Sequence, residues 1–287
     1  MLVRLGNVDI ALLCDGNWRL DGGAFFGIVP KVMWERQLVP DARNRVLLHL
    51  NCPLLRVGGK NFLVDTGLGT KQPAKRQEIF DMKVGHLTED LRAHGLQPED
   101  IDYVLFTHLH WDHAGGATCY SASGELKTTF PKAQYLAQRA DWDEATHPTE
   151  RNKAGYYEED LVPLMASRQL ELLDGDTEIV PGVSCKLTGG HTSGHQIALV
   201  DAAGQKAVFF GDIVPTVGHL PLPYGQSYDL YPNELLRHKK DLLAIAEREQ
   251  WLVLFDHETV TPAGYLTRDE GGRLRLRPSD AALFRGE

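Results

Sequence analysis

Residues 107–116 are T-H-L-H-W-D-H-A-G-G, which places four ligand-type side chains, His108, His110, Asp112 and His113, within six positions. They directly follow the apolar run Tyr103-Val104-Leu105-Phe106, whose β-branched and aromatic side chains predict a buried strand. Because imidazole and carboxylate groups suit Zn(II), Fe(II) and Mn(II), a strand that ends in such a loop predicts a site for one or two cations. A solvated polar loop is the alternative, but it would not require so many ligand groups together.

Three further blocks follow the first one along the chain. They are G-H-T-S-G-H at residues 190–195, F-F-G-D at 209–212 and F-D-H at 255–257. With H-x-H-x-D-H in the first block, the chain resembles the metallo-β-lactamase superfamily over most of its length. The resemblance implies an α/β fold of the αββα type, in which two mixed sheets pack face to face with helices outside, formed by a single domain over residues 1–287.

The resemblance also implies that seven side chains hold two metal ions. Three would hold the first ion, three the second, and one would bridge them: His108, His110 and His191; Asp112, His113 and His257; Asp212. Asp112 would also pass a proton to the leaving group, so Asp112 and Asp212 are the predicted catalytic residues. Asp65, in the run F-L-V-D-T-G at 62–67, would support the loop at residues 107–116, called the metal loop below; the alternative is that Asp65 is a simple turn residue. His195 would hydrogen-bond its own turn.

Such a ligand set suits two divalent ions, with Zn(II) as the expected metal and Fe or Mn as alternatives. Water bound by such ions has a pKa of about 7 instead of ~15.7, so a bridging hydroxide could attack a carbonyl at neutral pH. The predicted function is hydrolysis of a small molecule, a lactone or carboxylic ester with an apolar substituent. The alternatives are a phosphotriesterase-like or thioesterase hydrolase, or a mono-iron or other non-hydrolytic metal-binding protein, although a mono-iron site would have no use for His257.

Within the superfamily, the ligand types favour the lactonase-like branch. His110 stands where the flavodiiron branch has glutamate, and Asp212 stands where true β-lactamases have cysteine or serine. The run H-L-H-W-D-H-A-G-G most resembles the N-acyl homoserine lactonases. Those enzymes carry a tyrosine three residues after the bridging aspartate, where this chain has Pro215. The candidates to replace that tyrosine are Tyr224, Tyr228 and His219.

The segment from Phe25 to Trp34 is rich in large apolar side chains without a strict period. It could cap the core, or it could hang over the site as the apolar wall that a pocket for acyl chains requires. Together with side chains near the ligand blocks, it supplies the predicted substrate pocket: Phe25, Phe26, Ile28, Met33, Trp34, Trp111, His219, Tyr224 and Tyr228.

Periodicity and turn residues predict the remaining elements. Strands are expected at residues 8–14, 51–57, 62–67, 130–136, 183–188, 196–201, 206–210 and 251–255, with a hairpin turn at 58–61. Helices are expected at 86–94 and 234–248, and further helical segments within 141–173.

Bulk composition excludes several classes of partner. The formal net charge of −9 argues against nucleic acid, whose phosphates require a basic surface. Charge interrupts the first apolar run at Arg4, and no apolar run reaches spanning length, so neither a signal peptide nor membrane attachment is expected. The four cysteines are scattered singly, which indicates reduced thiols in a cytoplasmic protein. The oligomeric state is left open, and a homodimer is compatible with the sequence.

Overall fold

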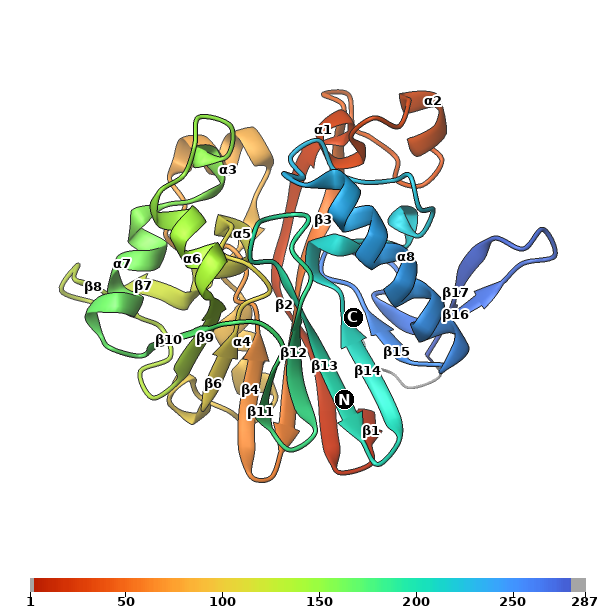
Figure 1. The fold of residues 1–287 in the computed structure, drawn as a ribbon. Coiled ribbons are helices and arrows are strands. Elements are labelled where there is room, and N and C mark those ends of the chain that lie inside the picture. The colour runs from red at the N-terminus through yellow and green to blue at the C-terminus, as the bar shows by residue number, and fades with distance from the viewer. Residues whose placement is uncertain (1–2, 280–287) are drawn as a thin grey trace.

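Two β-sheets pack face to face in the computed structural model, which describes residues 3–279 (Figure 1). Helices α4 (Leu87–Ala93), α6 (Arg139–Thr146) and α7 (Glu158–Ala166) cover the outer face of one sheet, and α8 (Pro232–Arg248) covers the other. The predicted αββα sandwich is confirmed. Residues 1–2 and 280–287 of the predicted domain lie outside the described residues.

The first sheet contains the N-terminal strands and the second contains the C-terminal ones. In the first, the order is β1 (Val3–Leu5), β2 (Val8–Asp21), β3 (Arg45–Val57), β4 (Lys60–Val64), β6 (Tyr103–Leu105), β9 (Gln134–Gln138) and β10 (Leu170–Leu173), with β5 (Lys83–Val84) beside β2. In the second, the order is β11 (Thr177–Val180), β12 (Val183–Leu187), β13 (Gln196–Ala202), β14 (Gln205–Phe209), β15 (Leu252–Leu254), β16 (Ala263–Arg268) and β17 (Leu274–Pro278).

Short elements connect and cap the two sheets. The short α-helices are α1 (Gly22–Phe26), α2 (Lys31–Trp34), α3 (Ala74–Phe80) and α5 (Trp111–Ala114). The 3-10 turns are η1 (Pro98–Asp100), η2 (Gly115–Ala117), η3 (Lys153–Gly155), η4 (Gly211–Ile213) and η5 (Val217–His219), and β7 (Thr118–Tyr120) pairs with β8 (Leu126–Thr128) as a separate ribbon. The hairpin expected at 58–61 is confirmed as the turn between β3 and β4.

Alternation along the strands divides the core into three apolar layers. In β15, Leu252 and Leu254 face the other sheet, whereas Val253 faces α8. In β4, Phe62 lies between the sheets and Leu63 lies under the helices of the first half. Both faces of these strands are therefore buried, which is why their sequences are continuous apolar runs without a polar face.

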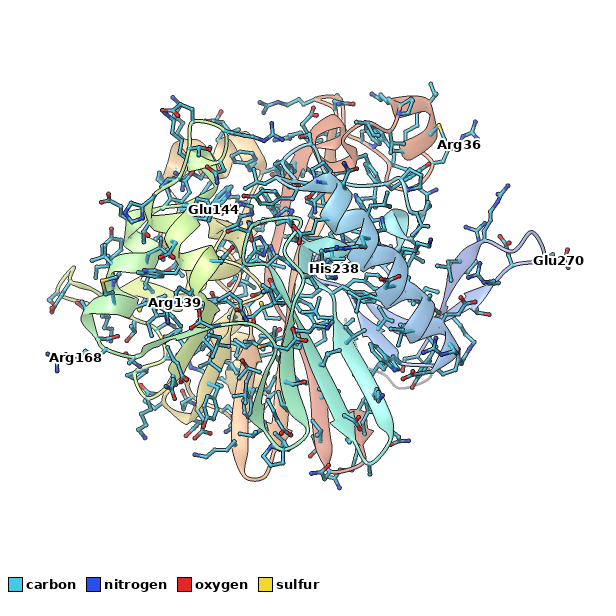
Figure 2. The ribbon with its side chains drawn as sticks, in the orientation of Figure 1. Arg36, Arg139, Glu144, Arg168, His238 and Glu270 are labelled. Atoms are coloured by element: carbon cyan, nitrogen blue, oxygen red, sulfur yellow. The ribbon has the colours of Figure 1, made fainter. Side chains whose placement is uncertain are left out.

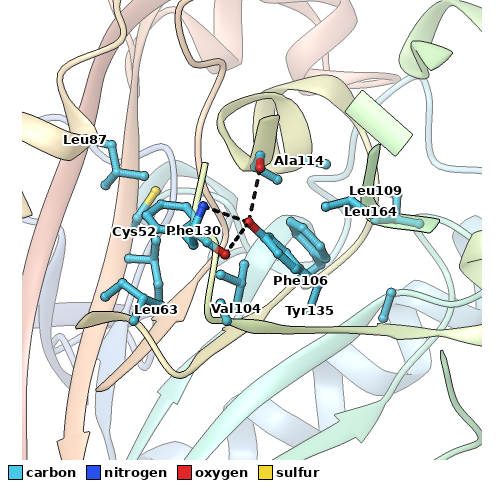
Figure 3. Packing of buried hydrophobic residues seen from close by; sticks show 14 of the residues in the cluster. Cys52, Leu63, Leu87, Val104, Phe106, Leu109, Ala114, Phe130, Tyr135 and Leu164 are labelled. Carbon is cyan, nitrogen blue, oxygen red and sulfur yellow. Dashed lines mark hydrogen bonds between the residues drawn. The ribbon is translucent and has the colours of Figure 1, made fainter. Parts of the chain in front are cut away.

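One buried hydroxyl in the layer under α4, α6 and α7 braces the segment that follows the metal loop. The hydroxyl of Tyr135 accepts a hydrogen bond from the main-chain N–H of Phe130 at 3.0 Å and donates to the carbonyl of Ala117 at 3.2 Å (Figure 3). Because Tyr135 is itself buried, leaving this hydroxyl unpaired would cost about 1–3 kcal/mol. The bonds join β9 to η2, which directly follows residues 111–114.

Parallel strands deliver four polar loops to the same edge of the sandwich. In the first sheet β4 and β6 are parallel neighbours, and they lead to Asp65 and His108. In the second sheet β14 and β15 are parallel neighbours, and they lead to Asp212 and His257. Because the carboxyl ends of parallel strands meet at one edge, residues far apart in sequence converge there.

Several differences from the sequence prediction concern local structure. The strand expected at 130–136 begins only at Gln134, as β9, and residues 130–133 form the turn before it. Residues 170–173, expected to be part of a helical segment, form β10 and pair in parallel with β9, so the helical prediction is wrong there. The leucine spacing of L-E-L-L is compatible with either period, and pairing with the exposed edge of β9 decides it. The apolar segment 25–34 forms parts of the short helices α1 and α2, joined by Gly27, which has φ +57°.

Many charged side chains of the described region are exposed. Charged side chains such as Arg168 and Glu270 extend from the periphery (Figure 2). Among the helices within residues 3–279, none has both the length and the apolar character that crossing a bilayer would require.

Candidate metal centre

Three buried histidines form a first cluster of ring nitrogens at the edge of the sandwich. Nε2 of His108 lies 2.9 Å from Nδ1 of His110, and Nε2 of His191 lies 3.1 Å from the same atom. The three rings come from the loop after β6 and from the turn between β12 and β13. All three are potential ligands for one ion.

A second cluster lies beside the first and contains the other predicted ligands. Nε2 of His113 and Nε2 of His257 lie 3.7 and 3.6 Å from the same oxygen of Asp112, Oδ2. Asp112 is contributed by the first turn of α5 and His257 by the loop after β15. Asp256, which the sequence argument did not single out, also has a carboxylate oxygen within 4.8 Å of ligand atoms of His113 and His257.

The carboxylate of Asp212 lies between the two clusters. Its Oδ2 is 3.0 Å from Nε2 of His191 in the first cluster. Its Oδ1 is 3.3 Å from Nε2 of His257 and 3.7 Å from Nε2 of His113 in the second. Each oxygen therefore faces a different set of imidazoles, which is the arrangement that a bridging ligand requires.

Hydrogen bonds on the far side of three rings orient their Nε2 atoms towards the centre. Nδ1 of His113 lies 2.9 Å from Oδ2 of Asp65, and Nδ1 of His191 lies 2.8 Å from Oδ1 of Asp229. Nδ1 of His257 lies 2.9 Å from the carbonyl oxygen of His49. Because these acceptors require a proton on Nδ1, the neutral form of each ring has its lone pair on Nε2, as a metal ligand needs.

Asp65 does more than orient one ring. Its Oδ1 accepts the main-chain N–H of Thr107 at 2.7 Å, and its Oδ2 accepts the Thr107 hydroxyl at 2.7 Å. Asp65 itself has φ +55°, which a non-glycine residue rarely adopts. The carboxylate thus fixes the start of the metal loop together with His113.

The electrostatics of the first cluster favour neutral imidazoles at His108 and His110, whereas burial of His191 is outweighed by Asp212 and Asp229, which raise the pKa of His191. Burial, with the neighbouring His113, lowers the pKa of His108 well below its usual range, and burial with His191 does the same to the pKa of His110. Burial would raise the pKa of Asp212, but His191 and His257 outweigh it and hold that pKa well below its usual range. Neutral imidazoles facing an ionised carboxylate are the protonation states in which metals bind.

The donor set fits divalent ions on a further ground. Within residues 3–279, Nε2 of His113 and Oδ1 of Asp212 are buried yet have no hydrogen-bond partner, and Oδ2 of Asp256 shares this condition. A buried polar atom without a partner costs free energy, so such atoms are normally satisfied. All three atoms belong to one group of potential ligands, which also includes His257. A cation placed among them would supply the missing partner.

Asp141 links the two loops that carry the first cluster, and sequence reasoning missed it. Its Oδ2 accepts the main-chain N–H of Leu109 at 2.6 Å, and its Oδ1 accepts the hydroxyl of Thr192. Gly194 packs so closely on Asp141 that a Cβ there would lie 2.2 Å from the Asp141 nitrogen. Burial raises the pKa of Asp141 to about 7.

Replacement of Asp141 by alanine is expected to destabilise the protein by about 2–4 kcal/mol, because the buried Leu109 N–H and Thr192 hydroxyl lose their acceptor. Asp141→Asn should cost less, since an amide can accept from Leu109 and donate to the Thr192 oxygen. Urea unfolding of both variants measures the difference. An alanine variant as stable as the parent would show that the two loops need no such link.

His195 and His219 are both buried, but neither faces the ligand clusters with a free nitrogen. In His195, Nε2 accepts the N–H of Asp212 at 3.1 Å and Nδ1 lies 2.8 Å from the Thr188 hydroxyl. In His219, Nε2 lies 3.0 Å from the carbonyl of Phe25 and Nδ1 lies 2.8 Å from the Thr216 hydroxyl. His219 was expected in the substrate pocket, and its structural role differs from that expectation because both nitrogens are used.

The apolar segment 25–34 differs from the expected pocket wall. Phe25, Phe26 and Trp34 are fully buried, with the Phe26 ring stacked between Trp34 at 5.4 Å and His219 at 4.6 Å. Packing among these rings stabilises them more than a position on the site wall would, because aromatic pairs add to area burial. The segment therefore matches the alternative interpretation, a cap on the core.

Three other expected pocket residues line different cavities. Ile28 is 90% exposed and lines a cavity of about 530 Å³ beside the 222–236 segment. Met33 and Tyr224 line a cavity of about 820 Å³ between α2 and α8, which contains none of the ligand residues. Of the predicted wall, only Trp111 and Tyr228 border the cavity described next.

A cavity of about 300 Å³ opens directly onto the two clusters. It is bordered by His110, Asp112 and Asp212 from the clusters, and half of its other lining residues are aromatic. Those aromatic residues are Trp18, Phe80, Trp111, Tyr157 and Tyr228. Sequence reasoning missed Trp18, Phe80 and Tyr157; Trp18 lies within β2 and pairs with Leu48, just after the bulge between Cys14 and Asn17.

Fold and site together define a protein with a paired metal-ligand cluster at the open edge of an αββα sandwich. The sequence profile of the Metallo-beta-lactamase superfamily matches residues 47–127 and 129–257. The chain therefore belongs to the metallo-β-lactamase superfamily, which confirms the resemblance drawn from its motifs.

The similar proteins of known name are metal-dependent hydrolases. An N-acyl homoserine lactonase of Bacillus cereus is 27% identical over 239 residues, which cover 75% of this chain and 83% of that enzyme. An N-acyl homoserine lactonase of Bacillus sp. is 31% identical over 162 residues, 52% of this chain and 57% of that enzyme. The crystal structure of a probable metal-dependent hydrolase from Staphylococcus aureus has a TM-score of 0.88 and 32% identity, and covers 97% of this chain and 100% of its own. These similarities class the chain as a metal-dependent hydrolase of the lactonase-like type.

Proposed function

We propose that this protein is a dinuclear metal hydrolase that cleaves a lactone or carboxylic ester with an apolar substituent. The observation that carries the proposal is the position of Asp212, whose two oxygens face two separate sets of imidazoles. His108, His110 and His191 would hold one ion, with Zn(II) expected. Asp112, His113 and His257 would hold the other, and Asp212 would bridge them.

Two divalent ions bound there would supply a water of pKa about 7 and a Lewis acid for the substrate carbonyl. The chain's own residues would do the rest. Asp112 borders the cavity with its carboxylate 11% exposed, so it can hold the proton released by the attacking water and return it to the leaving alkoxide. The aromatic wall would hold the apolar substituent and exclude water from it.

Three residues, Tyr224, Tyr228 and His219, were candidates to replace the lactonase tyrosine. Of these, Tyr228 borders the cavity together with Asp112 and Asp212. Its ring lies 5.7 Å from that of His191. Burial, followed by the negative charges of Asp212 and Asp112, raises the pKa of Tyr228 well above its usual range, so the hydroxyl keeps its proton. A protonated hydroxyl beside the clusters can donate a hydrogen bond to the substrate carbonyl. It would replace the tyrosine that the lactonases carry at the position of Pro215 in this chain.

Replacement of Tyr228 by phenylalanine is therefore expected to lower kcat by about 10- to 100-fold with little change in metal content, because one donor to the developing oxyanion is lost. Tyr224→Phe is the matched control, since Tyr224 borders the cavity of about 820 Å³, which contains none of the ligand residues. Steady-state kinetics of both variants on one ester measure the effect. Equal losses in the two variants, or none in either, would remove Tyr228 from the mechanism.

A hydrolysis screen tests the proposed function directly. The protein loaded separately with Zn, Mn and Fe would be assayed on lactones, aryl esters, thioesters and paraoxon. The proposal predicts that carboxylic esters or lactones have the highest kcat/KM. Preference for paraoxon or for thioesters would change the proposed substrate class to phosphotriesters or thioesters. Absence of turnover on all four substrate classes with both ions bound would contradict the assignment as a hydrolase of these bonds.

A further inference from the structure

A guanidinium group borders the cavity that opens onto the clusters. Arg151, from the segment between α6 and α7, borders this cavity and is exposed. Its Nη2 donates to the carbonyl of Ser227 at 2.9 Å and lies 3.4 Å from the carbonyl of Asp229. Main-chain oxygens from the opposite side of the cavity thus hold the group in place.

The positive charge of Arg151 has no carboxylate partner within the described part of the chain. No acidic oxygen of residues 3–279 lies within 4.0 Å of its guanidinium. Asp229 offers Arg151 only its main-chain oxygen, because its carboxylate binds Nδ1 of His191 and the main-chain N–H of Gln226. Asp112 and Asp212 border the same cavity but face the imidazoles.

The cavity that Arg151 shares with the clusters has many aromatic lining residues. Trp18, Phe80, Trp111 and Tyr157 border it, and the last two are backed by Arg76, whose guanidinium lies 5.1 Å from the Trp111 ring and 3.9 Å from the Tyr157 ring. Arg76 is thereby engaged with the wall itself. Arg151 also borders the neighbouring cavity of about 530 Å³, so the two cavities meet at this cation.

We infer that Arg151 recognises an anionic group, a carboxylate, at the end of the substrate remote from the bond that is cleaved. This inference rests on the proposed function and narrows its substrate to an acyl ester or lactone with an apolar or aromatic middle and a carboxylate terminus. A planar guanidinium whose orientation is fixed can bind a carboxylate through two parallel hydrogen bonds. The aromatic rings that border the same cavity as Arg151 and the ligand residues fit the apolar middle.

The test compares two substrates that differ only in charge. One is the mono-aryl ester of a dicarboxylic acid, and the other is the same ester with a terminal carboxamide, which has nearly the same shape. For the parent protein, kcat/KM should be about 10- to 100-fold higher for the carboxylate, because one charge-assisted pair distinguishes the two. Arg151→Gln should abolish this ratio, mainly through KM, and leave the carboxamide within about threefold.

Two further variants separate recognition from structure. Lys153→Gln removes an exposed cation two residues away that does not border the cavity, and it should leave the ratio unchanged. Arg151→Lys keeps the positive charge but not the two parallel N–H donors of a guanidinium. It should retain part of the preference for the carboxylate substrate. Equal loss of activity on both substrates in Arg151→Gln would mean that Arg151 only ties the two loops together, and would overturn the inference.

A binding measurement keeps the inference separate from the proposed function. Because Trp18 and Trp111 border the cavity, a free dicarboxylic acid that enters it should change tryptophan fluorescence, with tighter binding than its half-amide. Arg151→Gln should remove that difference. If the parent hydrolyses neither ester yet binds the dicarboxylate through Arg151, the proposed function fails and the inference about anion recognition stands. If both esters are cleaved equally and the two acids bind equally, the inference fails and the proposed function stands.

Discussion

Replacement of Asp212 by alanine is expected to lower kcat/KM by more than about 100-fold and to reduce the bound metal from two ions to one or none. Loss of a residue that only hydrogen-bonds a metal ligand typically costs about 10- to 100-fold in metal affinity or activity. Loss of a bridging ligand should therefore cost more. Without this carboxylate, the two cations would also repel each other across the space between the clusters.

Asp212→Asn is the second variant to measure, because the amide keeps the shape of the side chain and removes its charge. The main-chain N–H of residue 212 can still donate to Nε2 of His195, so the turn should fold normally. Metal analysis and kinetics of both variants, beside their melting temperatures, provide the comparison with the parent. A variant that folds, keeps both ions and retains full kcat would make Asp212 merely a turn residue.

Removal of the metals is expected to lower the melting temperature by roughly 5–10 °C or more. A ligand present at 100 times its Kd contributes about 2.7 kcal/mol of stability, and each kcal/mol corresponds to roughly 2–4 °C in a protein of this size class. The physical cause is that a buried cation satisfies the unpartnered atoms of His113 and Asp212. Thermal unfolding before and after chelation measures the shift, and readdition of Zn(II) should restore it.

The pH dependence of the metal-free protein follows from His257. Burial lowers its pKa, but Asp256 and Asp212 outweigh burial and raise the pKa to about 9 in the metal-free fold, against about 6.5 for an unfolded histidine. This contribution to stability is fully present below pH 6.5 and is lost as the pH rises to 9. Metal binding strengthens over the same range because the ligands must lose protons. The melting-temperature difference between loaded and metal-free protein should therefore grow from pH 6.5 to 9; a constant difference would contradict His257 as a ligand.

The sandwich and the ligand-bearing loops could be predicted because their signals are local. An apolar run followed at once by H-L-H-W-D-H determines both a buried strand and what its end presents, and β6, β14 and β15 all lie where such runs predicted strands. The strand β10 was missed because four residues carry too little periodic signal, and its state depends on pairing with β9.

The surroundings of the centre could not be predicted because they depend on tertiary packing. Asp229 is 38 residues from the histidine that it orients, and no spacing rule connects the two. The aromatic rings of Phe26 and Trp34 have the composition of a pocket wall, but Phe26 stacks between Trp34 and His219, and both rings lie in the core. The rings that do border the cavity, Trp18 and Tyr157 among them, come from a long strand and a connecting segment without a motif.

The number of metal ions per chain tests the dinuclear centre most directly. Protein purified without chelator would be analysed for Zn, Fe and Mn together by elemental analysis, beside an accurate protein concentration. The account predicts two ions per chain, because Asp112, His113 and His257 have no joint purpose in a site for one. A reproducible value of one, unchanged after incubation with Zn(II) or Mn(II), would contradict it.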